Sequence, residues 1–245
     1  MRVATYNIHG GVGRSGVFDL DLIATVLAEI GADVVGLQEV DSGRARSGGA
    51  DQAQHLAHAL GYRAVFSAAQ SNVDPGEYGN AILARFPIVS HMTLTLPGVS
   101  VWRAEPRCAA EAVVAAPEGK LSVWSVHLGV RQIERARQTS ALLGRMRRAI
   151  HEEERMPLVL MGDLNAGPRS RLLRALGASL TVAAPARRST FPASFPLLSL
   201  DHVLVSPPLS ILSAGPHDSP SSREASDHLP FVADLSWPRS GDEPV

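Results

Sequence analysis

Cysteine and lysine are the scarce residues of this chain. Cys108 is the one cysteine in 245 residues, so an internal disulfide is excluded and the redox compartment stays open. Lys120 is the one lysine, and arginine supplies the remaining positive charge. The formal net charge is −1, so the overall basic field typical of nucleic-acid-binding proteins is missing.

Long hydrophobic runs are also missing. None approaches the roughly 20 residues that a membrane-spanning helix needs. The first residues, Arg2 to Asn7, read as a strand and show no signal-peptide pattern, so we expect a cytoplasmic protein and a monomer. The sequence shows no P-loop, no dinucleotide-binding fingerprint and no nucleophile elbow.

Periodicity and turn residues predict many strands and a few helices. Helical spacing of apolar residues predicts helices over 20–30, 53–60, 131–148 and 169–176. In the long third helix we expect a core-facing stripe of Ile133, Ala136, Leu143, Met146 and Ile150. Predicted strands are 2–9, 33–40, 62–67, 79–85, 88–96, 107–115, 120–128, 158–162, 199–205, 209–214 and 229–235.

This distribution predicts an α/β fold in which two packed sheets carry helices on their outer faces. A length of 245 residues is ample for one large core. We expect a single domain over residues 1–237 and a disordered tail over 238–245.

The most informative stretch is residues 158–165, Leu-Val-Leu-Met-Gly-Asp-Leu-Asn. It reads as a buried strand that stops on a glycine and then presents a carboxylate and an amide. If the backbone stays extended, Asp163 and Asn165 point to the same side. A carboxylate binds a metal or takes a proton from water, and an amide donates to a developing negative oxygen.

The same arrangement recurs along the chain, because several other predicted strands begin or end on a polar residue. Residues at one rim of packed sheets converge even when they are distant in sequence. The polar residues at these strand ends are Asn7, Glu39, His127, Asp163, Asn165, Asp201, His202, Asp227 and His228.

The chemistry of this set favours metal-assisted hydrolysis. Carboxylates and amides without a cysteine ligand suit a hard cation such as Mg²⁺ or Mn²⁺. A metal, an acid–base pair and positioned donors are what the attack of water on a phosphate ester requires. His202 follows Asp201 but faces the opposite way in a strand, which favours a structural role.

Seven motifs together resemble the endonuclease/exonuclease/phosphatase superfamily, which includes deoxyribonuclease I. They occur in the family's order between residues 5 and 230, and each alone is weak. The motifs are Thr-Tyr-Asn-Ile-His (5–9), Leu-Gln-Glu-Val (37–40), Tyr-Gly-Asn-Ala-Ile-Leu (78–83), Ser-Val-His-Leu (125–128), Gly-Asp-Leu-Asn (162–165), Leu-Asp-His-Val (200–203) and Ser-Asp-His-Leu-Pro (226–230).

The resemblance implies a four-layered α/β sandwich and a divalent-metal-dependent phosphoesterase. It implies that Glu39 is the main Mg²⁺ or Mn²⁺ ligand, with Asn7 and Asp227 close to the same metal or to a second one. It also implies that Asp163 activates the attacking water.

The remaining implied roles concern the phosphate. Asn165 and His228 would hydrogen-bond the scissile phosphate as charge builds. His127, oriented by Asp201, would face the phosphate and protonate the leaving oxygen. Asn80 and Arg107 match positions that bind phosphate oxygens in relatives.

The substrate stays open at this stage, because the same site serves DNA, RNA, lipid and inositol-phosphate enzymes. The near-zero net charge and short loops favour a small or lipid-type phosphodiester. A DNA endonuclease or exonuclease is the alternative. A membrane-acting sphingomyelinase is expected to show an apolar hairpin or an export signal, and the sequence shows neither. Arg44 and Arg46 follow Glu39 on a loop that either contacts substrate or is simply solvated.

Overall fold

A computed structural model describes residues 1–69, 76–98, 105–152, 156–185 and 189–237. The predicted disordered tail, 238–245, lies outside the described residues and stays a prediction. No helix within the described part of the chain is long and apolar enough to cross a membrane.

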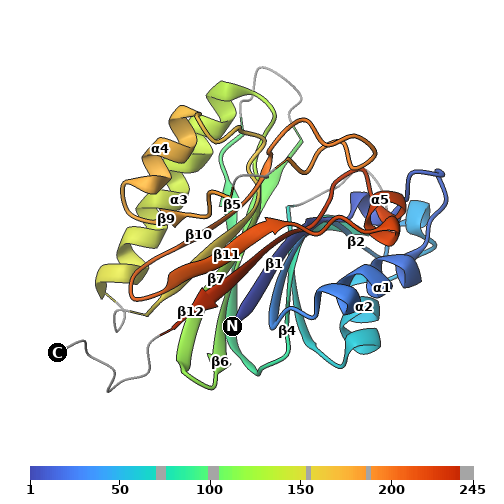
Figure 1. Cartoon of the computed structure of the whole chain (residues 1–245), viewed down its shortest axis with the longest axis horizontal. Coiled ribbons are helices and arrows are strands. Elements are labelled where there is room, and N and C mark those ends of the chain that lie inside the picture. The colour runs from blue at the N-terminus through green and yellow to red at the C-terminus, as the bar shows by residue number, and fades with distance from the viewer. Residues whose placement is uncertain (70–75, 99–104, 153–155, 186–188, 238–245) are drawn as a thin grey trace.

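Two six-stranded mixed sheets pack face to face, as the sequence predicts (Figure 1). In each sheet one adjacent pair is parallel, β1 with β2 and β7 with β8, and the other pairs are antiparallel. The first sheet has the order β11 (Ser210–Pro216), β12 (Phe231–Ser236), β1 (Arg2–Asn7), β2 (Val34–Ser42), β4 (Glu77–Ala84) and β3 (Arg63–Ala68). The second has the order β5 (Ile88–Leu96), β6 (Arg107–Ala116), β7 (Gly119–His127), β8 (Leu158–Asp163), β10 (Asp201–Val205) and β9 (Thr181–Val182).

Helices cover the outer faces and complete the four layers. Helices α1 (Leu20–Ile30), α2 (Gln52–Leu60) and α5 (Pro220–Ala225) pack on the first sheet. Helices α3 (Gln132–Glu152) and α4 (Arg171–Gly177) pack on the second. Short 3₁₀ turns, η1 (His9–Gly11) and η2 (Ala45–Ser47), follow β1 and β2.

Helix α1 shows why the sequence predicted the helices well. Asp19 caps its start by accepting a hydrogen bond from the Leu22 amide at 2.9 Å, and Gly31 ends it with φ +60°. Helix α5 was not predicted, although Ser219 and Pro220 form a capping signal that sequence reasoning had passed over.

The predicted core stripe of α3 is wrong in its first turns. Ile133 and Ala136 are exposed, whereas Gln138 is buried and its side chain accepts a hydrogen bond from the Gly129 amide at 2.8 Å. The start of α3 therefore packs against the polar backbone that follows β7 rather than against apolar side chains. Met146 does face the core, Leu143 is half-buried, and the side chain of Ile150 lies outside the described set.

The two sheets approach closely just below the polar strand ends. A Cβ on Gly36 would lie 2.9 Å from the Met161 side chain and 3.1 Å from that of Ser125, both in the opposite sheet. Within the second sheet, a Cβ on Gly162 would lie 1.9 Å from the carbonyl oxygen of Val126 on the neighbouring strand β7. Glycine at these positions lets the strands come together where the polar residues meet.

Candidate active site

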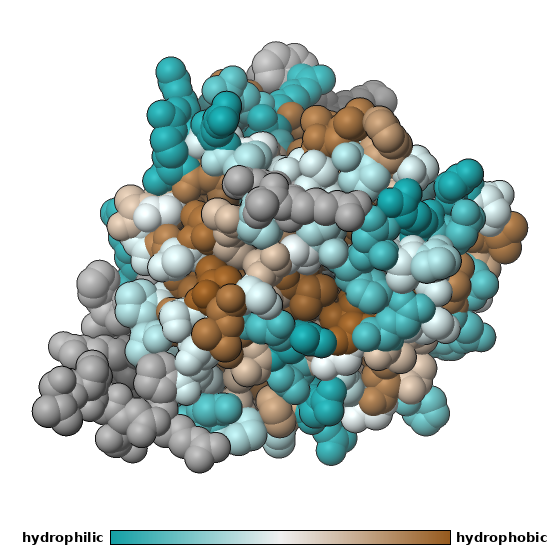
Figure 2. All heavy atoms as spheres, in the orientation of Figure 1, coloured by the Kyte–Doolittle hydropathy of each residue, from teal (hydrophilic) through white to brown (hydrophobic). Residues whose placement is uncertain are grey.

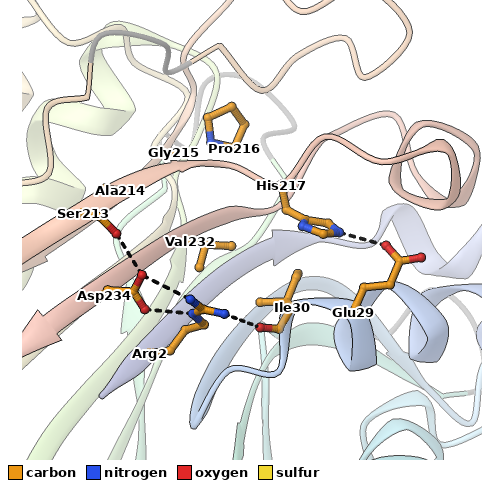
Figure 3. A pocket seen from close by; sticks show the side chains of 10 residues that line it. All are labelled: Arg2, Glu29, Ile30, Ser213, Ala214, Gly215, Pro216, His217, Val232 and Asp234. Atoms are coloured by element: carbon orange, nitrogen blue, oxygen red, sulfur yellow. Dashed lines mark hydrogen bonds and ion pairs between the residues drawn. The ribbon is translucent and has the colours of Figure 1, made fainter.

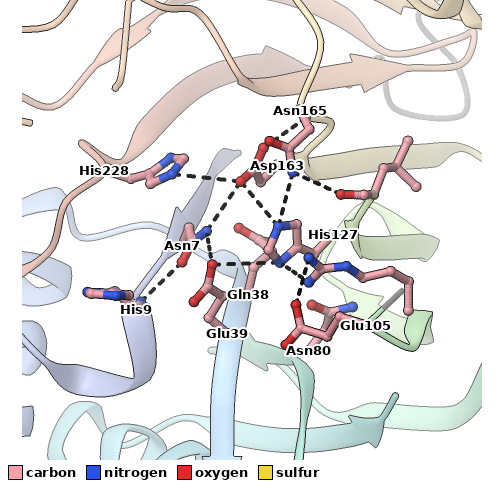
Figure 4. Close-up of polar contacts among 12 residues, drawn as sticks. Asn7, His9, Gln38, Glu39, Asn80, Glu105, His127, Asp163, Asn165 and His228 are labelled. Carbon is pink, nitrogen blue, oxygen red and sulfur yellow. Dashed lines mark hydrogen bonds and ion pairs between the residues drawn. The ribbon is translucent and has the colours of Figure 1, made fainter. Parts of the chain in front are cut away.

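Strand register aligns three of the predicted residues across the second sheet. Asp163 on β8 pairs with His127 on the parallel neighbour β7. It also pairs with Asp201 on the antiparallel neighbour β10. In the first sheet Asn7 on β1 pairs with Gln38, beside Glu39 on β2. The site therefore forms where one end of each sheet meets the other (Figure 4).

Backbone strain is concentrated at this place. The non-glycine residues with positive φ in the described part of the chain are His9 at 49°, Glu39 at 57° and Asn165 at 47°. Glu39 lies on an irregularity in the register of β2 with β4 between Leu37 and Val40. Non-glycine residues are held in this region only when surrounding structure fixes them, and such residues gather at functional sites.

Asn7 joins the two sheets. Its side-chain amide nitrogen donates to Glu39 Oε1 at 2.9 Å and to Asp163 Oδ2 at 3.2 Å. Its amide oxygen accepts from the His9 amide at 3.1 Å. Asn7 thus holds two carboxylates at a fixed separation, one from each sheet.

Asp163 is buried among charges. Burial and the nearby carboxylate of Asp201 raise its pKa to about 7, although His228, the Asn165 amide and Asn7 favour the ionised form. Such a carboxyl accepts and releases a proton near neutral pH, as a general base must.

Asp201 orients His228, which corrects the expectation that it orients His127. Asp201 Oδ2 lies 2.8 Å from His228 Nδ1 and accepts from the Thr190 hydroxyl at 2.5 Å. Burial alone lowers the pKa of His228, but Asp201 and, less strongly, Asp163 raise it to about 10. The His228 imidazole is therefore a cation, and its Nε2 lies 3.7 Å from Asp163 Oδ2.

His127 is held by Arg107 instead. Arg107 donates to His127 Nδ1 at 2.9 Å, which leaves the ring proton on Nε2, 3.4 Å from Asp163 Oδ2. Burial, the Arg107 charge and His228 hold the pKa of His127 well below its usual value. A lowered pKa favours the neutral imidazole, and the expected role of His127 in protonating the leaving oxygen stays a prediction.

Asn165 lies beside His127, but its backbone is not extended as the sequence analysis expected. Its backbone lies in the left-handed region with φ 47°, and its main-chain N–H donates to Asp163 Oδ1 at 2.9 Å. Its side chain donates to the Leu128 carbonyl at 2.9 Å and lies 3.2 Å from His127 Nε2.

The predicted phosphate-binding residues, Asn80 and Arg107, lie next to His127. Arg107 is buried and forms an ion pair of 2.9 Å with Glu105, an interaction that the sequence did not suggest. Asn80 is buried on β4 and donates to the Cys108 carbonyl at 2.8 Å. That contact ties Asn80 to the strand of Arg107, so its role in binding phosphate stays a prediction.

Asp227 and His202 lie at the edge of the cluster. Ser226 donates to the Asn7 carbonyl at 2.8 Å and lies 3.4 Å from Asp227 Oδ1, so Asp227 is linked to the site through Ser226. Its role as a metal ligand stays a prediction. His202 is buried on β10 with Nε2 2.8 Å from the Ala166 carbonyl, a contact that supports a structural role.

A polar cavity of about 300 Å³ opens beside Glu39. Arg46 stands at this cavity, fixed by two hydrogen bonds of 2.7 Å to the buried carboxylate of Asp41 and placed 5.4 Å from the centre of the Tyr78 ring. Glu105 and His9 also line it. Arg44 lies 3.9 Å from Asp41, so both loop arginines pack on this acid.

The donor set fits a hard divalent cation. Carboxylate oxygens predominate, and the Oδ1 atom of Asp201 is buried without a hydrogen-bond partner. Ligand atoms of Asp163, Asp201 and His228 lie within 4.8 Å of one another and could hold a metal. Because His228 Nδ1 and Asp201 Oδ2 already pair at 2.8 Å, the partly exposed Glu39 is the better candidate.

A layer of polar side chains lies directly below these residues, and sequence reasoning missed it. Thr5 donates to Gln38 Oε1 at 3.1 Å, and Gln38 donates to Ser125 in the other sheet at 3.0 Å. Ser125 donates to the Leu37 carbonyl at 3.0 Å. Thr5 and Ser125 precede Asn7 and His127 by two residues, and this strand period could have revealed them.

A second polar cavity, of about 270 Å³, lies at the other end of β1 (Figure 3). Arg2 pairs there with Asp234 at 2.8 Å, and His217 pairs with Glu29 at 2.9 Å. The sequence predicted no site at this cavity.

Nearly the whole chain is similar to known proteins. The model of the Endonuclease/Exonuclease/phosphatase family matches residues 4–228. An uncharacterized protein of Escherichia coli K12, YbhP, is 30% identical over 261 residues, which cover 96% of this chain and 95% of YbhP.

Solved structures share the fold. A mannosyl-6-phosphatase of Bacteroides thetaiotaomicron, Bt3783, superposes with a TM-score of 0.79 at 20% identity and covers 97% of this chain and 100% of its own. The catalytic domain of human Nocturnin with bound sulfate gives a TM-score of 0.74 at 23% identity, with 96% and 94% covered. At these identities the likeness concerns the fold.

Proposed function

We propose, from the premise that this chain belongs to the endonuclease/exonuclease/phosphatase family, that it is a phosphodiesterase dependent on Mg²⁺ or Mn²⁺. The observation that supports this most directly is the convergence of Glu39 and Asn7 from one sheet with His127 and Asp163 from the other. Members of this family hydrolyse phosphoesters. The metal, the substrate class and the residue roles are our proposal.

Glu39 would hold the cation, with Asn7 orienting its carboxylate and Asp227 nearby. When bound, the cation supplies positive charge to the phosphate oxygens and lowers the barrier to attack. Asp227 and Asn7 as further ligands would depend on a second metal or on reorientation of the Asn7 amide.

Asp163 takes a proton from the attacking water, because its pKa near 7 allows it to be ionised and yet basic at neutral pH. The water oxygen bonds to phosphorus as the P–O bond to the leaving group breaks, and the leaving alkoxide takes a proton from solvent, which yields a monoester and an alcohol. The Asp163 proton is then released to solvent.

The charge that builds on phosphate is met by fixed donors. The imidazolium of His228, held by Asp201, donates through Nε2, which faces Asp163. His127 donates through its neutral Nε2–H, and the amides of Asn165 and Asn80 and the guanidinium of Arg107 provide further donors. Donors fixed before the reaction stabilise the transition state without reorganisation.

A small or lipid-type phosphodiester suits the cavity beside Glu39. Its volume of about 300 Å³ and its lining of Arg46, Tyr78 and Glu105 accommodate one polar group of modest size. We propose a cytoplasmic location and a monomer as the sequence predicts.

Hydrolysis of bis(p-nitrophenyl) phosphate tests the reaction. We expect turnover that requires Mg²⁺ or Mn²⁺ and that stops when EDTA is added. A panel of phospholipid, inositol phosphate, nucleotide, RNA and plasmid DNA then tests the substrate class. Plasmid nicking with steep salt dependence, in preference to the small diesters, would favour the nuclease alternative. Undiminished turnover in EDTA would exclude the metal-dependent reaction.

A further inference from the structure

Large hydrophobic side chains that the fold leaves exposed are concentrated around the mouth of the site. Within the described residues they lie mostly in loops that follow or precede the site-bearing strand ends. We call this set the apolar rim: Val17, Phe18, Val130, Ile133, Phe195, Leu197 and Leu198. Other exposed examples, Val89, Met92 and Leu212, lie on β5 and β11, away from these strand ends.

The loop of residues 190–198 carries the most exposed part of the rim and is bound to the site itself. Thr190 donates to Asp201 at 2.5 Å, and the Phe191 ring lies 4.8 Å from that of His228. The Ala193 amide donates to the Asp227 carbonyl at 2.7 Å. Phe195 is nevertheless 70% exposed and Leu197 65% exposed. These hydrophobic side chains are therefore held out in solvent by an anchored loop.

The other parts of the rim are fixed in the same way. Val130 lies three residues after His127, and the intervening Leu128 amide donates to the Asp163 carbonyl at 3.0 Å. In the loop before α1 the Gly13 amide donates to the Val17 carbonyl at 3.0 Å, and the Arg14 amide donates to the Glu224 carbonyl of α5 at 2.8 Å. Three segments from different parts of the chain thus present apolar side chains near the site-bearing strand ends.

The view in Figure 1 places the orange loop before β10 and the dark blue loop before α1 at the same upper end of the molecule. Figure 2 shows hydrophobic surface over the orange loop, bordered by hydrophilic surface. The apolar rim is therefore discontinuous and mixed with polar groups. It differs in this from the single apolar hairpin expected of a membrane-acting sphingomyelinase.

Charge in these loops has one sign. Segments 12–18, 129–133, 167–171 and 190–198 contain no aspartate or glutamate and contain the exposed arginines Arg14, Arg131, Arg169 and Arg171. Arg14 pairs with Glu224 of α5 at 3.5 Å. The other three arginines make these segments basic, whereas the chain as a whole carries a net charge of −1. Exposed apolar side chains among arginines match an anionic lipid surface, which offers acyl chains below and phosphates above.

We propose that the apolar rim docks the protein on the surface of an anionic phospholipid bilayer, with the site facing lipid headgroups. The inference rests on the proposed function and narrows its substrate class to the phosphodiesters of phospholipid headgroups. A lipid surface is favoured over a protein partner because the rim is discontinuous, comes from three separate segments beside the site and lies among exposed arginines. A protein seated on it would cover the site, whereas a bilayer brings phosphodiesters to it.

Vesicle co-sedimentation in EDTA tests docking without turnover. We expect the full chain to bind vesicles of phosphatidylcholine mixed with phosphatidylglycerol. It should bind vesicles of phosphatidylcholine alone less well, and its binding to the mixed vesicles should weaken as the salt concentration rises. Phe195→Ser combined with Leu197→Ser should lower the bound fraction about tenfold. The matched control is Leu212→Ser, because Leu212 is 71% exposed but lies on β11.

Activity on bis(p-nitrophenyl) phosphate separates docking from the reaction. The double variant should hydrolyse this small diester at the wild-type rate, and Asp163→Asn should bind vesicles like the wild type. Vesicle binding by a protein that hydrolyses no diester would leave docking in place and remove the proposed function.

Three results would overturn the docking proposal. In the first, the wild-type protein stays in the supernatant with anionic vesicles at low salt. In the second, Leu212→Ser loses as much vesicle binding as the double variant. In the third, the wild type forms dimers in sedimentation velocity and the double variant does not. The third result would assign the rim to self-association.

Discussion

Two polar clusters at opposite ends of β1 contain the same kinds of side chain but differ in burial. At the second cavity the Arg2 and Asp234 side chains are 45% and 37% exposed, and the pKa of Asp234 is lowered by hydrogen bonds from Arg2 and Ser213 (Figure 3). Hydrogen bonds from His217 and from serines lower the pKa of Glu29 to about 2. Every shift there favours the charged form.

The candidate active site shows the opposite (Figure 4). Burial raises the pKa of Asp163 to about 7 and holds that of His127 well below its usual value. The surroundings oppose the charged forms of Asp163 and His127 but favour that of His228, and the backbone at Glu39 and Asn165 is strained. An ion-pair cluster whose surroundings favour the charged forms stabilises a fold. A cluster with buried groups of strongly shifted pKa and a strained backbone is suited to bind a cation or move a proton.

The largest expected effect is a loss of kcat on mutation of the candidate active site but not of the second cavity. Glu39→Gln and His228→Ala should each lower kcat for bis(p-nitrophenyl) phosphate by about 10²–10⁴-fold, because one removes the proposed metal ligand and the other the proposed charged donor. The matched controls are Glu29→Gln and His217→Ala at the second cavity, which should leave kcat unchanged. Near-wild-type turnover in the first pair would remove the functional distinction between the clusters.

Asp201→Asn should lower kcat less, by about 10²-fold at neutral pH. Asp201 raises the pKa of His228 to about 10, so the imidazolium persists in the wild type until the pH approaches that value. Without Asp201, burial lowers this pKa and His228 becomes neutral at lower pH. The rate relative to wild type should therefore be higher near about pH 6 than near about pH 9. A ratio independent of pH would contradict this role of Asp201.

Ser125→Ala tests the polar layer below the site. Loss of its bonds to Gln38 and Leu37 should loosen Glu39 and weaken Mn²⁺ binding about tenfold in calorimetric titration. Ser122→Ala is the control, because Ser122 lies on the same strand and accepts from the Trp124 ring at 2.9 Å on the other face. Thr5→Ser should keep the affinity that Thr5→Val loses. Equal losses in Ser125→Ala and Ser122→Ala would show that the layer acts on stability alone.

Stability of the metal-free protein should give the smallest effects, with opposite signs. The raised pKa of Asp163 means that the folded state holds its proton more tightly, so stability falls as pH rises from about 4 to about 7. Asp163→Asn should raise Tm above neutral pH by about 5 °C.

Asp234→Asn is the counterpart. Its lowered pKa contributes stability that is present above about pH 4 and is lost in acid, so the variant should lose at most about 1 kcal/mol at neutral pH. Thermal melts in EDTA across pH measure both variants. A lower Tm for Asp163→Asn would show that this carboxylate is not held against its preference.

The fold and the members of the cluster could be predicted because strand ends and turn residues are local signals. Asp163 and His127 each end a strand of apolar residues, and short motifs mark Glu39 and His228. The start of α3 could not be predicted, because Gln138 is buried against the backbone at Gly129, a tertiary contact without a sequence period.

Pairings within the cluster were also beyond the sequence. Asp201 and His228 are 27 residues apart, and their contact is a tertiary one between β10 and the residues before β12, which no local pattern marks. The apolar rim was missed for the same reason, because its members come from three loops that are each unremarkable in sequence.

We propose that the two sheets meet around one hard cation held by Glu39. Anomalous diffraction from a crystal soaked in Mn²⁺ would locate this cation. We expect a peak bonded to the Glu39 carboxylate, on the side of Asn7 and Asp163. A peak enclosed by Asp163, Asp201 and His228 with none at Glu39 would contradict it.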